Sequence, residues 1–108
     1  MEDLHSYKDM RAVYADTLID LAGEDEHLLV LEADLMSASG TKGFKDKFPG
    51  RLINAGVAEA NMVGVAAGLS SQGYIPFVNT FGCFATRRAY DQFFLSANYA
   101  RQNVKLVG

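Results

Sequence analysis

The sequence predicts an α/β fold, in which a parallel sheet carries helices on both of its faces. Segments of strand character recur along the chain at residues 28–31, 51–54, 74–79 and 104–107. Between the later strands lie two segments of helix character, at residues 59–71 and 87–100. Strands that alternate with helices at this spacing form parallel units with right-handed crossovers, so we expect a single sheet of this kind.

The first helix is predicted from the spacing of apolar residues after a polar lead-in at residues 1–8. Positions three or four apart form one face of a helix. Here they hold Met10, Val13, Tyr14, Thr17, Leu18 and Leu21. We expect Gly23 to end this helix in the left-handed conformation that glycine adopts readily.

A buried strand is predicted at residues 28–31, where Leu-Leu-Val-Leu forms a continuous apolar run. Asp34 follows at its carboxyl end. Residues 35–50 are rich in Ser, Gly and Lys, and we expect an ordered loop with a helical turn around residues 44–48. A loop of this length in a small domain is usually functional or flexible.

The second half of the chain predicts two helices and two strands. The helix expected at residues 59–71 is rich in small residues and contains Gly64 and Gly68, which suit close helix packing. Its partner is either a neighbouring element of the same domain or a second chain. The last strand leads into an apolar end, residues 104–108, and we expect the chain to be part of something longer.

Composition argues against several classes of protein. The net charge is −3 and the ten Lys and Arg are scattered, so no basic face for nucleic acid is expected. No apolar run approaches the roughly 20 residues of a membrane span. The one cysteine, Cys83, cannot form an internal disulfide, and the acidic N-terminus is unlike a secretion signal. We expect a cytoplasmic protein without nucleic-acid or membrane partners, in which Cys83 is a small buried residue.

Polar and aromatic residues gather in three segments, residues 34–50, 56–61 and 80–87. All three should lie at the carboxyl ends of strands, where open α/β sheets bind ligands. This clustering predicts a site without naming its ligand. His5 and His27 have no Cys or carboxylate at metal-ligand spacing, so we predict no metal ligand in this chain. The remaining candidates are expected to be solvated lysines, namely Lys42, Lys45 and Lys47.

Residues 51–69 read Arg-Leu-Ile-Asn-Ala-Gly-Val-Ala-Glu-Ala-Asn-Met-Val-Gly-Val-Ala-Ala-Gly-Leu. This segment resembles the pyrimidine-binding domain of transketolases, above all the C-terminal subunit of two-chain forms. The resemblance runs from about Met10 to Gly108 and implies that residues 1–108 are a truncated pyrimidine-binding domain of the thiamine diphosphate-binding fold. It further implies that Glu59 hydrogen-bonds ring nitrogen N1′ of the cofactor's aminopyrimidine. From its position alone, Glu59 could instead be a first-turn residue that favours the helix dipole.

The same resemblance implies further cofactor-binding residues. Phe81 and Phe84, spaced three apart, would pack around the pyrimidine ring. Arg87 occupies the next position in this spacing, where many transketolases have an aromatic residue and deoxyxylulose phosphate synthases have Arg. Asp34 would lie near the cationic thiazolium, where a negative charge is favourable. The alternatives are a core aromatic pair and a turn-forming Asp.

A substrate phosphate site is also implied. Arg11 lies 23 residues before Asp34, the spacing seen in transketolases whose Arg grips the sugar phosphate. Guanidinium suits phosphate because it offers a bidentate, permanently charged fork. The alternative is a solvated Arg at a helix start. Ser37 and Ser39 flank Ala38, which occupies the position of the family's phosphate-contacting Ser, and Ser37 is the candidate here.

The resemblance implies part of a transketolase, which transfers a two-carbon ketol unit between sugar phosphates with thiamine diphosphate and Mg²⁺ or Ca²⁺. The diphosphate and the metal would be held by a diphosphate-binding domain or subunit, in a homodimer or heterotetramer, so we expect the chain to be inactive alone. One alternative is a deoxyxylulose phosphate synthase or a 2-oxoacid dehydrogenase beta subunit, and Arg88-Ala-Tyr-Asp-Gln resembles the synthase. Another is a non-catalytic assembly module that retains the fold.

Overall fold

The computed structural model describes residues 9–108; the predicted lead-in and His5 lie outside the described residues. Its centre is a four-stranded sheet in the order β2-β1-β3-β4, and each pair of neighbouring strands is parallel. The strands are β1 (Leu28–Glu32), β2 (Leu52–Asn54), β3 (Ile75–Asn79) and β4 (Lys105–Val107). The predicted parallel α/β sheet is confirmed.

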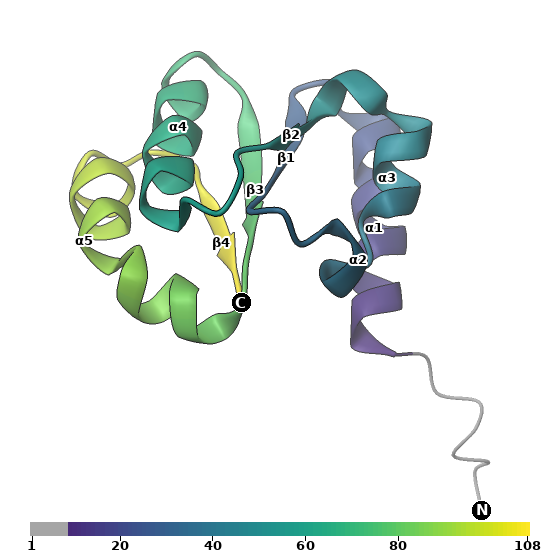
Figure 1. Cartoon of the computed structure of the whole chain (residues 1–108). Coiled ribbons are helices and arrows are strands. Elements are labelled where there is room, and N and C mark those ends of the chain that lie inside the picture. Colours follow the sequence, from purple (N-terminus) through teal and green to yellow (C-terminus); the bar gives the residue numbers. More distant parts are fainter. Residues whose placement is uncertain (1–8) are drawn as a thin grey trace, which may run out of the picture.

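Helices cover both faces of the sheet, as Figure 1 shows, with α1, α2 and α3 on one side and α4 and α5 on the other. Their bounds are α1 (Met10–Glu24), α2 (Met36–Ser39), α3 (Lys42–Lys47), α4 (Glu59–Ser71) and α5 (Tyr90–Gln92). A short 3₁₀ segment, η2 (Pro49–Arg51), precedes β2. Two π-helical segments flank α5, namely η3 (Phe84–Arg88) and η4 (Phe93–Tyr99).

Each face of the sheet has its own hydrophobic core, because successive side chains of a strand point to opposite faces. Val30 of β1 packs with Leu18 of α1 and Phe44 of α3. Its neighbour Leu31 packs on the other side, with Met62 and other residues of α4. The central strand is buried along its whole length, which explains its continuous apolar sequence.

The buried face of α1 agrees with the predicted one only in part. Its buried residues are Ala15, Leu18 and Ala22, of which Leu18 was predicted. Small alanine side chains let the helix lie close to the sheet, and a pattern of large apolar residues does not detect such a contact. Four residues of the predicted face are instead exposed: Met10, Val13, Thr17 and Leu21.

Several element boundaries also differ from expectation. Gly23 does not adopt a left-handed conformation; α1 continues to Glu24, and the N–H of Asp25 caps it by bonding to the Leu21 carbonyl. The predicted loop at residues 35–50 contains α2 and α3. The helix expected from residue 87 begins earlier, since residues 82 and 83 are already helical, and the segment from Phe84 is π-helical, with the Ala89 N–H donating to the Phe84 carbonyl at 3.1 Å.

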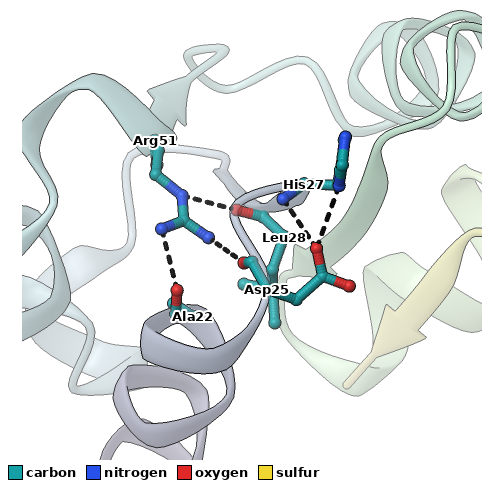
Figure 2. Close-up of polar contacts among 5 residues, drawn as sticks. All are labelled: Ala22, Asp25, His27, Leu28 and Arg51. Carbon is teal, nitrogen blue, oxygen red and sulfur yellow. Dashed lines mark hydrogen bonds and ion pairs between the residues drawn. The ribbon is translucent and has the colours of Figure 1, made fainter.

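Arg51 ties the end of α1 to the start of β1. Figure 2 shows its guanidinium donating to the carbonyls of Ala22, Asp25 and Leu28, at 2.9, 2.6 and 3.0 Å. Carbonyls at the carboxyl end of a helix lack hydrogen-bond partners within the helix and carry partial negative charge. The guanidinium supplies both hydrogen-bond donors and a positive charge. This contact lies at the amino ends of β1 and β2, away from the edge of the sheet described next.

Candidate functional site

The strand register aligns three polar residues along the carboxyl edge of the sheet. Side by side across this edge lie Asn54 of β2, Glu32 of β1 and Asn79 of β3, with Val107 of β4 at the end of the row. The chain segments that follow these strands carry the predicted site residues Asp34, Glu59 and Phe81. A ligand at this edge would therefore meet side chains from several strand ends at once.

Asn54 joins the segments that follow β1 and β2. Its Oδ1 accepts from the backbone N–H groups of Asp34 and Gly56, at 2.9 and 3.1 Å. Its Nδ2 donates to Asp34 Oδ1 at 3.2 Å. Asp34 and Gly56 both have positive φ, 61° and 75°, so one side chain fixes two left-handed turns. Sequence reasoning missed this role, although an Asn at a strand end before Gly is a typical turn signal.

Glu59 is the first residue of α4, and its side chain is only 3% exposed. Its Oε1 accepts a hydrogen bond of 3.2 Å from Nη1 of Arg88, whose side chain is 54% exposed. A buried carboxylate without a partner is costly, so this ion pair stabilises the burial of Glu59. Sequence reasoning did not identify Arg88 as a partner of Glu59.

Aromatic rings lie next to this ion pair. The Arg88 guanidinium stands over the Phe84 ring, 4.1 Å from its centroid. The Phe84 and Phe81 rings are 6.1 Å apart and tilted by 46°. Phe84 is half-buried and Phe81 is 49% exposed, so these rings are open to a ligand rather than part of a closed core.

Arg87 and Cys83 are both exposed and line a shallow hollow of about 410 Å³ with Phe84 and Arg88. The expectation that Cys83 is buried is wrong. It directly precedes the first turn of η3, where only every third or fourth side chain can reach the core, and Ala85 takes that place.

A buried polar network crosses the centre of the edge. Glu32 is fully buried, and its Oε1 accepts from Ser39 Oγ at 2.6 Å, Thr41 Oγ1 at 2.5 Å and Asn79 Nδ2 at 3.0 Å. Glu32 Oε2 has no hydrogen-bond partner among the described residues. The network links β1, β3 and the α2–α3 segment, so it fixes the shape of the edge. Sequence reasoning missed it because it depends on the register between strands.

Tyr14 of α1 extends this network to a further element. Its hydroxyl donates to Asn79 Oδ1. Burial of the phenol, and next to it the charge of Glu32, raise the pKa of Tyr14 well above its ordinary value. The neutral, donating form of the phenol is therefore favoured.

A cavity of about 290 Å³ lies beside the network. Its walls include Arg11, Tyr14, Ser39, Asn79, Thr80 and Phe81. Phe81 connects this cavity to the ring cluster around Phe84. Buried Thr80 Oγ1 has no hydrogen-bond partner in the described part of the chain.

Arg11 and Ser37 lie together but to one side of this cavity. Both line a neighbouring open hollow of about 380 Å³, and Arg11 also lines the cavity itself. Arg11 pairs with Asp9 at 2.9 Å and donates to the Ala38 carbonyl at 3.3 Å. Its hydrogen bond holds the pKa of Asp9 below its ordinary value. Ser39, rather than Ser37, is the serine that lines the cavity.

The remaining candidates lie outside this arrangement. Gly64 and Gly68 are exposed, and a Cβ added at either would meet nothing within 4 Å, so they do not pack closely within the described domain. His27 pairs with Asp25 at 3.1 Å at the opposite end of the sheet. Residues 9–108 hold no cluster of ligands for a metal ion. Within this range no helix combines the length and the apolar character that crossing a membrane requires.

Comparison with known sequences gives consistent matches. A family model described as the transketolase pyrimidine binding domain matches residues 6–108. The chain is 52% identical over 99 residues to a 6-deoxy-6-sulfo-D-fructose transketolase subunit of Clostridium sp. (strain MSTE9), covering 92% of this chain and 31% of that protein. It is 46% identical over 101 residues to a transketolase C-terminal section of Methanocaldococcus jannaschii, covering 94% and 32%. It thus spans about a third of these relatives.

Two solved structures share the architecture. A split-gene transketolase, described as an inactive beta4 tetramer, superposes with a TM-score of 0.81 at 44% identity, covering 89% of this chain and 32% of that one. The transketolase of Campylobacter jejuni superposes with a TM-score of 0.79 at 22% identity, covering 94% and 17%. The second match shows the fold alone.

A further sequence match, 45% identical over 80 residues, is a 1-deoxy-D-xylulose-5-phosphate synthase of Lawsonia intracellularis. It covers 74% of this chain and 12% of that protein.

Proposed function

This chain belongs to the family of transketolase pyrimidine-binding domains, and we propose that it forms the half-site for the aminopyrimidine ring of thiamine diphosphate in a transketolase. One observation carries the proposal. Glu59 is a buried carboxylate at the start of a helix, and the planar N–H donor that reaches it lies over the ring of Phe84. An aminopyrimidine ring needs such a carboxylate at N1′ and such an aromatic wall.

The residues present fit this cofactor. The guanidinium of Arg88 is planar, donates an N–H to Glu59 at 3.2 Å and stacks 4.1 Å from the Phe84 centroid. Its contacts are evidence that this corner accepts a flat, N–H-bearing group. Thiamine diphosphate, when bound, supplies the carbon atom that carries the two-carbon ketol unit between sugars.

The chain's own residues would bind and orient the ring. Glu59 would hold a proton at the ring nitrogen N1′, and its burial strengthens that hydrogen bond. Phe84 and Phe81 would exclude water and keep the ring in plane. Asn54 fixes the Gly56 turn that leads into α4, so it would keep the Glu59 carboxylate in position. Asp34, held by the same side chain, would favour a nearby cationic thiazolium.

A partner would complete the site. We propose that a diphosphate-binding domain or subunit holds the diphosphate and Mg²⁺ or Ca²⁺, in a homodimer or heterotetramer. The match to a transketolase C-terminal section and to a split-gene transketolase tetramer supports a two-chain enzyme. We therefore expect these residues to have no ketol transfer activity by themselves.

The substrates proposed are sugars with an anionic tail, sugar phosphates first. Arg11 lines both the 290 Å³ cavity and the hollow that holds Ser37, so it is placed to meet such a tail. The Clostridium relative acts on a sulfonated sugar according to its name, which makes a sulfonate tail the second candidate. Assays with matched phosphate and sulfonate ketoses distinguish the two.

A different reaction on the same half-site is the main alternative. The 45% identity to a deoxyxylulose phosphate synthase favours it, as does the sequence at residues 88–92. The two reactions separate by donor: a transketolase uses a ketose, and the synthase would use pyruvate. A non-catalytic assembly module would use neither.

The proposal is tested by titrating thiamine diphosphate and Mg²⁺ into this chain mixed with its cognate diphosphate-binding chain, for the natural protein and Glu59→Gln. We expect the natural complex to bind cofactor and transfer ketol units. The Glu59→Gln complex should assemble equally well but lose most turnover, a loss on the order of 10²-fold or more. If the natural chain neither binds cofactor nor pairs with its partner, the assembly-module alternative is favoured.

A further inference from the structure

Arg88 makes the two contacts that the aminopyrimidine ring would need. Its Nη1 lies 3.2 Å from Glu59 Oε1, and its guanidinium carbon lies 4.1 Å from the centroid of Phe84. One guanidinium makes both contacts, so the face of Phe84 that it covers is the face beside Glu59. A ring stacked on that face and bonded to that oxygen would need the same space.

We propose that Arg88 competes with the aminopyrimidine ring for Glu59 and Phe84, and thereby sets how tightly the half-site binds its cofactor. This inference rests on the function proposed above. Only molecules in which Arg88 has left Glu59 are able to bind the cofactor. Their fraction of the whole population determines the apparent affinity. The apparent dissociation constant of the cofactor rises in inverse proportion to that fraction.

The local backbone explains why Arg88 rather than Arg87 occupies this position. The hydrogen bond from the Ala89 N–H to the Phe84 carbonyl closes the π-helical turn. Arg88 is the last residue inside this turn. Arg88 therefore comes back over Phe84, while Arg87 extends into the hollow beside it. An extra residue within a helical turn of this kind is often found at functional sites.

Arg88 is also able to leave. Its side chain is 54% exposed, and it is held by one hydrogen bond and one cation–π contact, which are modest where solvent reaches them. Glu59, at 3% exposure, cannot follow it into solvent. The movable partner is thus the arginine, and the carboxylate stays in place for a new partner.

The test is calorimetric titration of thiamine diphosphate with Mg²⁺ into the complete assembly, comparing the natural protein with Arg88→Gln, Arg88→Lys and Glu59→Gln. Arg101→Gln is the matched control, because Arg101 is exposed and lies beyond the opposite end of the sheet. We expect Arg88→Gln to bind the cofactor about tenfold more tightly, the gain for a site that Arg88 fills nine-tenths of the time. Arg88→Lys, which keeps the charge but not the flat stacking group, should fall between, and Arg101→Gln should match the natural protein.

Equal or weaker binding by Arg88→Gln overturns the competition. If Arg88→Gln does not fold because Glu59 loses its partner, Arg88→Lys decides by the same criterion. Glu59→Gln separates this inference from the proposed function. Because Glu59→Gln also removes the partner of Arg88, its turnover rather than its affinity is the criterion. When that variant transfers ketol units as fast as the natural protein, the aminopyrimidine half-site is wrong, and Arg88 has no ring to compete with. When Glu59→Gln loses turnover and Arg88→Gln leaves binding unchanged, the half-site stands and only the competition fails. If the natural protein shows no binding, binding that appears in Arg88→Gln supports the competition and its absence overturns it.

Discussion

Glu32 of β1 and Asn79 of β3 lie opposite each other at the carboxyl edge of the sheet and share a hydrogen bond of 3.0 Å between Oε1 and Nδ2. The same carboxylate oxygen accepts from Ser39 and Thr41. A single buried side chain therefore connects the two central strands to the segment that follows Asp34. The shape of the candidate site depends on this connection.

Replacing Glu32 separates its shape from its hydrogen bonds. Glu32→Leu removes the acceptor for three donors. We expect a loss of about 2–4 kcal/mol in the free energy of unfolding, because a buried donor without a hydrogen bond is costly. Glu32→Gln keeps an oxygen acceptor of the same shape and should cost about 1 kcal/mol. Urea unfolding measures both. Equal stability of the two variants would show that the network does not hold the edge together.

Tyr14 predicts a stability loss at high pH. Its pKa is raised in the folded chain above the ordinary value of 10.0, mainly by burial and then by the charge of Glu32. Between these two pKa values the unfolded chain binds fewer protons than the folded one, so stability is full below about pH 10 and falls above it. Near pH 10 the slope should stay below the limiting value of about 1.4 kcal/mol per pH unit, because the phenol of the unfolded chain is only partly deprotonated there.

This slope is checked by urea unfolding measured at intervals of about one pH unit between about pH 8 and pH 11. Tyr14→Phe is the control, since it keeps the ring and removes the titrating group. The variant is expected to be less stable at neutral pH, because Asn79 loses a donor, yet to lose stability less steeply with rising pH. Parallel slopes for the two proteins would rule out this role for Tyr14.

The sequence predicted elements well where local chemistry determines them. The helix expected at residues 59–71 has the same bounds in the structure, because a Gly-containing turn precedes it and Gly73 adopts a left-handed conformation after it. The prediction for Gly23 was wrong because the same residue type is also tolerated inside a helix, at a cost that tertiary contacts offset. The buried face of α1 was predicted only at Leu18, because Ala15 and Ala22 make the rest of its contact and small side chains give a weak hydrophobic pattern.

The sequence named candidate site residues but not the contacts between them, and the roles of these residues stay predictions. The structure brings Phe81 and Phe84 together and places Glu59 in the same corner, linked to Phe84 through Arg88. Ser37 and Asp34 lie elsewhere at this edge, apart from that corner and from each other. Their proposed roles stay predictions. Arg88 could not be singled out because an arginine on a helix gives no signal of the partner it meets. The register across strands, which places Glu32 beside Asn79, is equally invisible to local patterns.

Replacing Asn54 by Asp is expected to cause a loss of stability that depends on pH. Asn54→Asp keeps the oxygen that accepts from the Asp34 and Gly56 amides, but it places a second carboxylate where Nδ2 lies 3.2 Å from Asp34 Oδ1. We expect a loss of about 0.5–1 kcal/mol in stability at neutral pH, since the pair is exposed to solvent. The introduced carboxylate repels a like charge, so the loss should shrink as pH falls through about 4.

Asn54→Ala is the matched comparison, because it loses the acceptor without adding a charge. Its loss of stability should not depend on pH, and the amide protons of Asp34 and Gly56 should exchange faster with solvent. Hydrogen exchange followed by NMR measures this directly. Unchanged exchange at both amides would mean that Asn54 does not fix these two turns.

Cys83 gives a direct footprint of the proposed cofactor site. It is the one cysteine of the chain, it is exposed, and it lines the hollow shared by Phe84, Arg87 and Arg88. We expect iodoacetamide to alkylate it readily in the folded chain, at a rate within about tenfold of that in urea, because an exposed thiol needs no unfolding to react. Thiamine diphosphate and Mg²⁺, added to the complete assembly, should slow this reaction several-fold by covering the hollow. Protection by the partner chain alone, with no further change on adding cofactor, would place Cys83 at the subunit contact rather than beside the ring.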